Sequence, residues 1–298
     1  FNISYLGTKG VFVALLAGLI VSRLLALITE KNIVIKLPDS VPEMVSESLS
    51  SLLAGVIIAI VFLIFRALFA VTPYGNATDC IYTIIQTPLQ SLTGNLPAFI
   101  IIILIAQLLW FFGIHGSMTV LPILFPIWLS YIGDNTAAMA AGKTIPHVLN
   151  IGLWDLANLG GSGATIGLVI LMFFKAKSNQ YKSFGKLTLP CGIFSVNEPV
   201  IFGLPVILNP IMLIPFIICP IVLVCLGYAL IQFGIVTAPI GILGLGSMPP
   251  LISGIMQGSL SWGIYQLVAV VISIIIYYPF FKTIDNQALA KEKGEQGE

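Results

Sequence analysis

One glutamate lies inside a stretch that cannot form a single helix, in a chain that is otherwise mostly apolar. Glu198 stands between Asn197 and Pro199, and further glycines and prolines follow as far as Pro210. A carboxylate at bilayer depth costs about 2.5 to 3.5 kcal/mol, so its presence there indicates a binding partner. Non-helical backbone survives at that depth only against protein or a water-filled cavity. The stretch 192–210 therefore predicts a broken hairpin that presents Asn197 and Glu198 to a polar ligand.

A second polar group of residues lies where two apolar segments meet. Trp110 precedes His115 by five residues, and glycines occupy positions 113 and 116. A lone histidine near a helix end is more often a packing residue, but flanking glycines let the backbone approach a ligand and expose the imidazole. On one continuous helix the two side chains lie about 500° apart and face different ways. They can converge if the helix breaks at Gly113.

A third polar group precedes the glycine-rich sequence 160–163. Asn150, Trp154, Asp155 and Asn158 have the spacing of one helix face that leads into a hinge. An ordinary turn in a loop outside the cytoplasm explains the pattern as well as a role in lining a pocket does. Both interpretations stay open at this point.

These groups together contain the side chains that bind sugars. A pocket for a small polar ligand needs apolar or aromatic walls and a few oriented hydrogen-bonding groups. Trp110 offers a face for stacking, and His115, Asn197 and Glu198 offer polar atoms, with Asn158 as a further candidate. We therefore predict a sugar as the ligand.

The composition limits the class of protein. The 298 residues are 58% hydrophobic and 8% charged, with a mean hydropathy of +1.05, whereas about a quarter of the residues of a soluble domain are charged. This is typical of a multi-pass membrane protein. A net charge of +1 gives no indication of a nucleic-acid partner. Motifs of ATPases, metalloproteases and serine hydrolases are missing, and we expect no metal and no cofactor.

Seven apolar segments are candidate membrane helices, given that a bilayer core needs about 20 residues. They span residues 11–28, 52–71, 97–112, 117–132, 163–174, 211–232 and 260–281. Polar stretches rich in glycine and proline separate several of them. We expect an interfacial segment within 72–95, and re-entrant or cavity-lining backbone in parts of 133–162 and 234–259.

The lysines predict the orientation. Residues 175–186 carry four lysines and no acidic residue, which places this loop in the cytoplasm, and the lysines after residue 281 place the tail there too. If both are cytoplasmic, the chain between the lysine-rich loop and the tail crosses the membrane an even number of times. This count favours a re-entrant hairpin for Glu198 that enters the membrane from the cytoplasmic side. The chain opens on Phe1 without a charged n-region or a small-residue cleavage site, so we expect no signal peptide, and we expect the chain to be part of something longer.

Two of these motifs resemble a known family. Trp-Phe-Phe-Gly-Ile-His-Gly around His115 and Val-Asn-Glu-Pro-Val-Ile-Phe-Gly-Leu-Pro-Val-Ile-Leu-Asn-Pro around Glu198 are similar to the membrane-embedded enzyme IIC subunit of the bacterial phosphoenolpyruvate-dependent sugar phosphotransferase system. The resemblance covers essentially the whole chain and is strongest to the lactose, cellobiose and diacetylchitobiose class. Members of that family continue further at the N-terminus.

The resemblance implies the fold and the division of the chain. The fold is an all-α polytopic membrane protein, a transmembrane helix bundle with two re-entrant hairpins, here without the first helices of the family. Residues 1–96 would be the remainder of the N-terminal helix set, with the dimer contact and a linker. Residues 97–281 would form the sugar-binding transport domain, and residues 282–298 a polar cytoplasmic tail. A homodimer in the bacterial cell membrane is implied.

The resemblance also implies the roles of the site residues. Glu198 is expected at the 6-hydroxyl of the disaccharide with His115 beside it, as the two catalytic residues, and Trp110, His115, Asn197, Glu198 and Asn158 are expected to bind the substrate. A separate soluble enzyme IIB would donate the phosphoryl group from a phosphocysteine, so the chain would be a translocating subunit that is not catalytic alone. The alternatives are a proton-coupled sugar transporter, in which Glu198 and His115 relay protons, and an inert helix bundle.

Overall fold

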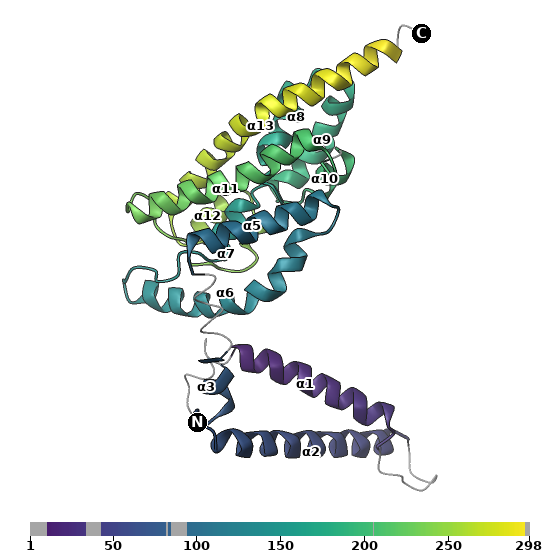
Figure 1. Ribbon diagram of the computed structural model, residues 1–298, viewed down its shortest axis with the longest axis vertical. Coiled ribbons are helices and arrows are strands. Elements are labelled where there is room, and N and C mark those ends of the chain that lie inside the picture. Colours follow the sequence, from purple (N-terminus) through teal and green to yellow (C-terminus); the bar gives the residue numbers. More distant parts are fainter. Residues whose placement is uncertain (1–10, 34–42, 82, 85–93, 205, 296–298) are drawn as a thin grey trace. The chain divides into compact units, whose positions relative to one another are not determined.

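The computed structural model describes residues 11–33, 43–81, 83–84, 94–204 and 206–295. Contacts within the chain divide it into two compact units, Phe1–Gln90 and Ser91–Glu298. Every regular element in the described ranges is a helix (Figure 1). Five of these helices are long and apolar enough to cross a membrane. The predicted all-α, multi-pass membrane architecture is confirmed.

The first unit contains two apolar helices and a short one. They are α1 (Val11–Glu30), α2 (Glu43–Ala70) and α3 (Ala77–Ile81). Only 6% of the membrane-length window of α1, and the same share of that of α2, is buried within the protein. A helix that is apolar on all sides is stable only inside a bilayer or a large core. The predicted dimer contact of this unit stays a prediction, and much of the predicted interfacial segment, residues 85–93, lies outside the described residues.

Five helices of the second unit coincide with the predicted apolar segments. They are α5 (Leu96–Phe111), α6 (Gly116–Ala140), α8 (Ile166–Lys175), α11 (Pro210–Gln232) and α13 (Leu260–Glu295). Side chains at their starts explain the boundaries. Asn95 accepts a hydrogen bond from the Ala98 N–H at 2.9 Å, and Asn209 accepts one from the Ile211 N–H at 3.0 Å, so both are N-caps.

The stretch 192–210 is broken into separate pieces, as its glycines and prolines predict. The helix α9 (Asn179–Ile193) ends at the beginning of this stretch, and the six-residue helix α10 (Glu198–Gly203) lies in the middle of it. The helix α11 begins at the end of the stretch, at Pro210. Ser195 and Leu208, in the two connections, have φ values of 59° and 56°, which no right-handed helix contains. Whether this hairpin re-enters the membrane stays a prediction.

Three further short helices lie in the two other polar stretches. They are α7 (Ile151–Ala157), the 3-10 helix η4 (Leu245–Ser247) and α12 (Ile252–Met256). The non-helical backbone between α7 and α8 is buried against α13, where the Ser273 Oγ donates to the Ala164 carbonyl and the Tyr277 hydroxyl donates to the Gly163 carbonyl, both at 2.7 Å. Buried carbonyls without such donors would each cost free energy. This packing explains how irregular backbone persists inside an apolar protein.

The lysine-rich segment 175–186 is mostly the helix α9 rather than a loop. The Asp285 carboxylate on α13 accepts from the backbone N–H groups of Lys177 and Ser178, at 2.8 and 3.0 Å, and Glu292 accepts from Asn179 at 3.0 Å. Carboxylates at a helix N-terminus satisfy its free N–H groups. The predicted polar tail is thus helical as far as Glu295 and holds the start of α9.

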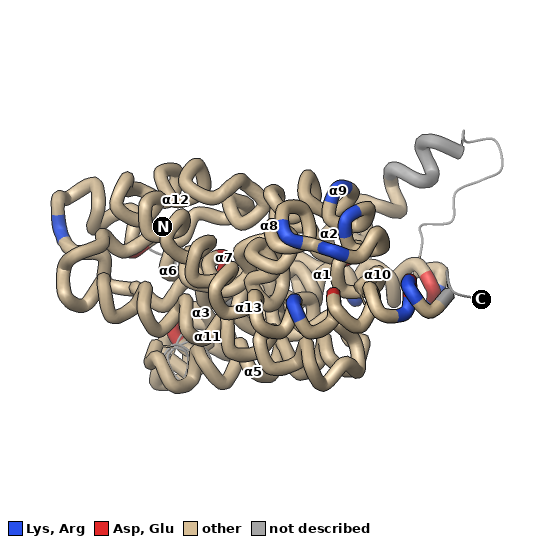
Figure 2. The backbone as a smooth tube through the Cα atoms, turned by 90° about the horizontal axis from the view of Figure 1, so that it is seen from above, with Lys and Arg blue, Asp and Glu red and all other residues tan. Residues whose placement is uncertain are grey.

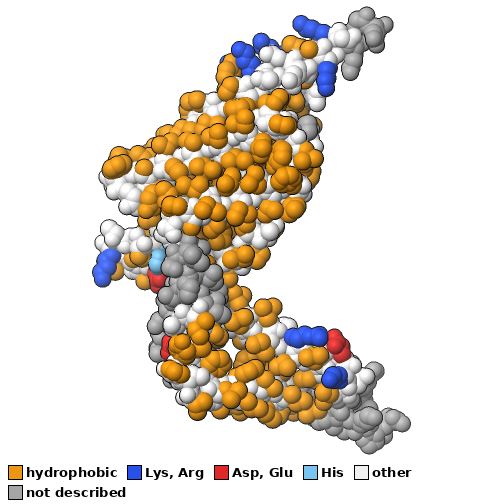
Figure 3. All heavy atoms as spheres, in the orientation of Figure 1, with side chains coloured by type: hydrophobic (Ala, Val, Ile, Leu, Met, Phe, Trp, Pro, Cys, Tyr) orange, Lys and Arg blue, Asp and Glu red, His pale blue; other side chains and the backbone are white. Residues whose placement is uncertain are grey.

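Charged side chains are concentrated at this end of the second unit. Figure 2 shows lysines on α9 and on the end of α13, and few charges along the rest of this unit. Figure 3 shows the same lysines beyond a surface that is mainly hydrophobic. A belt of apolar side chains with charges at its edge is the pattern expected where a protein leaves the hydrocarbon layer.

Candidate functional site

Glu198 begins α10 and points its carboxylate into an accessible space. Val200 and Ile201, two and three positions after Glu198, are fully buried and anchor the short helix. The Glu198 side chain keeps 48% of its surface exposed. The apolar residues thus fix the helix while the carboxylate at its first turn stays available to a ligand.

Trp110 and His115 meet because the helix breaks between them. α5 ends at Phe111, Gly113 adopts a φ of 82°, and α6 begins at Gly116. A positive φ suits glycine, which lacks a Cβ atom, and it reverses the chain here. The ring centroids of Trp110 and His115 lie 4.2 Å apart. The helix thus breaks at Gly113, and this break brings the two side chains together.

The hydrogen bonds of His115 set the direction of its imidazole. Its Nδ1 accepts from the Met118 N–H at 3.2 Å, so the side chain is the N-cap of α6. In a neutral ring the other nitrogen, Nε2, then carries the proton. Nε2 lies 3.8 Å from the Glu198 Oε1. A hydroxyl oxygen beside this pair can lie about 2.8 Å from both atoms, accept from the histidine and donate to the glutamate.

Asn197 is buried and already hydrogen-bonded within the protein. It is 3% exposed, and its Nδ2 donates to the Ser162 carbonyl at 2.7 Å and to the Thr165 Oγ1 at 2.9 Å. Both amide hydrogens therefore have partners, and the side chain fastens the α10 hairpin to the loop between α7 and α8. Only its oxygen remains for a ligand.

The third polar group splits between two places. Asn158 ends α7 and donates to the Trp154 carbonyl at 2.8 Å. Asn150 begins α7 and lies elsewhere, where it donates to the carbonyls of His147 and Pro239, both at 2.8 Å. Both asparagines are caps of α7 with non-helical backbone angles, so they do not share one helix face, and only Asn158 lines the cavity described next.

A single cavity of about 210 Å³ collects the predicted residues. Trp110, His115, Asn158, Asn197 and Glu198 all line it. Residues absent from the predicted set complete the wall, and they come from α6, α7, the glycine-rich loop, the α9–α10 connection and η4. They are Ser117, Met118, Trp154, Asp155, Gly161, Ser162, Ser195, Gly246 and Ser247. Gly246 and Ser247 arise from the stretch 234–259, whose glycines gave the only sequence signal for them.

A larger cavity lacks comparable chemistry. It has a volume of about 570 Å³ and lies between the end of α6 and the backbone that follows α11. Lys143 is its one charged lining residue, and its lining contains no histidine and no acid. The smaller cavity is the better candidate because it places a carboxylate, an imidazole and an aromatic ring together.

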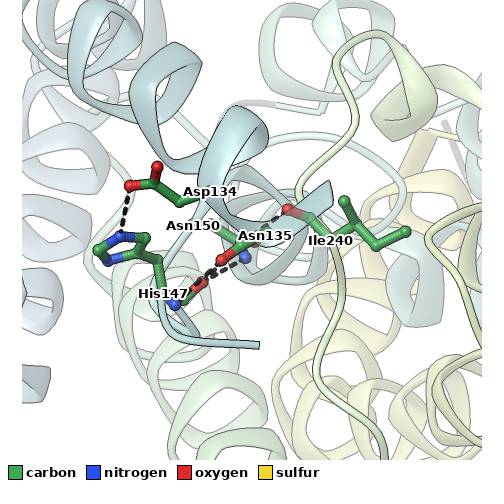
Figure 4. Close-up of polar contacts among 5 residues, drawn as sticks. All are labelled: Asp134, Asn135, His147, Asn150 and Ile240. Carbon is green, nitrogen blue, oxygen red and sulfur yellow. Dashed lines mark hydrogen bonds and ion pairs between the residues drawn. The ribbon is translucent and has the colours of Figure 1, made fainter. Parts of the chain in front are cut away.

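The second histidine has a partner that the sequence did not predict. The His147 Nε2 lies 3.0 Å from the Asp134 Oδ2 (Figure 4). The His147 ring also stacks on Tyr131, with the two ring centroids 4.0 Å apart. Asn135 beside it donates to the carbonyls of His147 and Ile240. These bonds tie α6 to two loops. No group of three potential metal ligands occurs among the described residues.

Comparison with known proteins identifies the family to which this chain belongs. The family model described as "Phosphotransferase system, EIIC" matches residues 1–220. The chain belongs to the EIIC family of the phosphotransferase system. As an EIIC chain it is a multi-pass membrane protein, which agrees with its five apolar helices.

Curated EIIC relatives extend beyond this chain. It is 38% identical over 293 residues to the lichenan permease IIC component of Bacillus subtilis (strain 168), covering 97% of this chain and 65% of that protein. It is 37% identical over 298 residues to the cellobiose-specific EIIC component of Geobacillus stearothermophilus, covering 98% and 66%. The chain thus spans just under two thirds of the length of these relatives.

A solved EIIC structure has the same fold. The crystal structure of ChbC, the IIC component from the N,N'-diacetylchitobiose-specific phosphotransferase system, aligns with a TM-score of 0.92 at 37% identity. The alignment covers 99% of this chain and 69% of ChbC. The family suggested by the two sequence motifs is therefore confirmed.

Proposed function

We propose that this protein is the sugar-translocating EIIC component for a β-linked disaccharide of the cellobiose or diacetylchitobiose type. The names of its relatives support this class of sugar, since they specify lichenan, cellobiose and N,N'-diacetylchitobiose. It acts as a permease of the bacterial cell membrane, as a homodimer, and delivers the sugar to the cytoplasmic face.

The placement of Glu198 beside His115 is the observation that carries this proposal. The 3.8 Å between Oε1 and Nε2 leaves a position where one hydroxyl oxygen bonds both groups. The Trp110 ring is 3% exposed, packs against the imidazole and lines the same cavity, so it forms part of the apolar wall beside the C–H face of a sugar ring. The sugar is thereby fixed with its 6-hydroxyl at the glutamate.

Phosphorylation follows at that hydroxyl. A soluble enzyme IIB partner donates the phosphoryl group from a phosphocysteine, and transfer mainly requires an oriented in-line nucleophile. Glu198 orients the hydroxyl and accepts its proton, and His115 hydrogen-bonds beside it. Asn158 contributes to the cavity wall, and Asn197 holds the hairpin with its oxygen toward the sugar. The charged product cannot recross the hydrocarbon layer, which makes uptake irreversible.

The substitution Glu198→Gln tests the role of the carboxylate. The amide keeps the shape and an acceptor, so we expect disaccharide affinity within a few-fold of the wild type. We expect sugar-phosphate formation to fall about 100-fold or more, since the proton acceptor is lost. The measurement is sugar-phosphate accumulation in vesicles supplied with phosphorylated IIB. Asp134→Asn, outside the cavity, is the matched control.

Two outcomes would contradict the proposed function. Normal sugar-phosphate formation by Glu198→Gln would remove the carboxylate from the reaction. Accumulation of free sugar that depends on a proton gradient and not on IIB would instead indicate a proton-coupled transporter.

A further inference from the structure

One carboxyl group in the cavity has no role in the function proposed above. The Oδ2 atom of Asp155 is buried and has no hydrogen-bond partner among the described residues. A buried polar atom without a partner costs about 1–3 kcal/mol, and such groups in native proteins usually have a functional reason. The Asp155 Oδ2 is therefore either a structural atom that stays without a hydrogen bond or an atom that forms its hydrogen bond with a bound ligand.

The position of Asp155 favours a ligand. It lies on α7, lines the same cavity as Glu198 and His115, and faces η4 across a close contact. A Cβ atom added to Gly246 would lie 2.4 Å from the Asp155 Oδ1. Glycine at this position thus leaves space for the carboxyl group between α7 and η4. This contact still leaves the Asp155 Oδ2 without a hydrogen-bond partner among the described residues.

The size of the cavity determines which part of the ligand Asp155 can meet. A volume of about 210 Å³ is smaller than the roughly 300 to 1,000 Å³ of pockets that enclose drug-sized molecules. It suits one sugar ring, with the second ring of a disaccharide outside. Glu198 and Asp155 would then contact the same ring from different elements, one at the 6-hydroxyl and the other at ring hydroxyls.

We propose that Asp155 is a specificity-determining residue that accepts hydrogen bonds from ring hydroxyls of the sugar ring whose 6-hydroxyl meets Glu198. This inference rests on the proposed function. The Asp155 Oδ2 is a buried acceptor without a hydrogen-bond partner among the described residues, and hydroxyls on neighbouring ring carbons are donors spaced to reach both carboxyl oxygens. Asp155 selects for a ring that carries these hydroxyls, since an analogue without one leaves a buried acceptor unpaired.

Deoxy sugars test the inference directly. Full-length protein in lipid nanodiscs is titrated with cellobiose and with its four analogues deoxygenated at position 2, 3, 4 or 6 of the non-reducing ring. The wild type should lose affinity 10-fold or more for at least one of the 2-, 3- and 4-deoxy analogues. In Asp155→Asn and Asp155→Leu that penalty should shrink to under 3-fold, while the 6-deoxy penalty, which belongs to Glu198, should persist.

Stability separates ligand binding from a structural role. Because the buried Asp155 Oδ2 has no hydrogen-bond partner among the described residues, ligand-free Asp155→Leu should melt at the wild-type temperature or above it, although its affinity for cellobiose falls. Gly246→Ala should mimic the binding defect by displacing the carboxyl group. Asp134→Asn, the same change at an aspartate outside the cavity, should keep every wild-type deoxy penalty.

Each result decides the question. Deoxy penalties in both Asp155 variants that equal those of the wild type overturn the role of Asp155 and leave the proposed function intact. A ligand-free melting temperature that falls in both variants, with those penalties unchanged, identifies a structural residue. If the wild type binds no β-linked disaccharide, the proposed function fails and this inference fails with it.

Discussion

At the scale of the residue, His115 has two roles, one for each nitrogen of its ring. Its Nδ1 caps α6 and its Nε2 faces Glu198, so one side chain both starts a helix and directs a proton toward the carboxylate. The cap fixes the tautomer that the site requires. Stability and binding are therefore coupled at this position.

Two substitutions of His115 should separate these roles. His115→Asn keeps an N-cap acceptor but removes the ring, so we expect a melting temperature close to that of the wild type and disaccharide affinity reduced 10-fold or more. His115→Ala also loses the cap, which should lower the free energy of unfolding by about 1 kcal/mol. Thermal melting and sugar titration of the two variants measure this. Equal melting temperatures of His115→Asn and His115→Ala would show that the N-cap does not contribute to stability.

At the scale of the element, the α10 hairpin depends on one buried amide. Asn197 bonds Ser162 and Thr165, and these residues precede α8. Glu198, the next residue, therefore takes its position from the loop between α7 and α8 as well as from its own helix. The cavity is lined by residues of the short helices α7, α10 and η4. Helices this short are not stable alone, so hydrogen bonds between segments are needed to hold the site together.

Asn197→Ala should loosen this hairpin. The loss of two buried hydrogen bonds should cost about 1–3 kcal/mol. We expect faster hydrogen exchange in residues 160–165 and 195–203 and weaker sugar binding. Asn158→Ala, on the same cavity wall, is the control for hydrogen exchange, because the Asn158 Nδ2 donates only to the carbonyl one turn before it. Comparable acceleration in both variants would contradict a specific role for Asn197.

At the scale of the whole molecule, the lysines define one end of the second unit. The start of α9 and the end of α13 are joined through Asp285 and Glu292, so their lysines lie on the same side of any membrane that crosses this unit. The positive-inside rule assigns that side to the cytoplasm.

Labelling of single cysteines should establish this orientation. In a variant with serine in place of the four native cysteines, Lys177→Cys and Lys291→Cys should react with a membrane-impermeant maleimide only when the cytoplasmic face is accessible. Inside-out vesicles and intact cells provide the two orientations. Labelling of both positions from outside intact cells would reverse the topology, and labelling from opposite sides would contradict the joint between α9 and α13.

Much of the helix pattern followed from the sequence because it depends on local chemistry. Long apolar runs predicted the five helices that can cross a membrane, and the glycines and prolines of 192–210 predicted the breaks around Glu198. The lysine-rich segment was expected to be a loop, but carboxylates more than 100 residues away, on α13, cap α9 there. No local pattern contains that information.

The sequence by itself determined which residues could bind a sugar, since few polar side chains occur in so apolar a chain. Only the tertiary structure decided how they are used. It joined Trp110, His115 and Glu198 in one cavity and engaged the amide of Asn197 in internal bonds. It also placed the Asp155 Oδ2 there without a hydrogen-bond partner among the described residues. The reason is physical: residue type and spacing fix the helices, whereas the environment of a side chain depends on contacts between segments distant in the sequence.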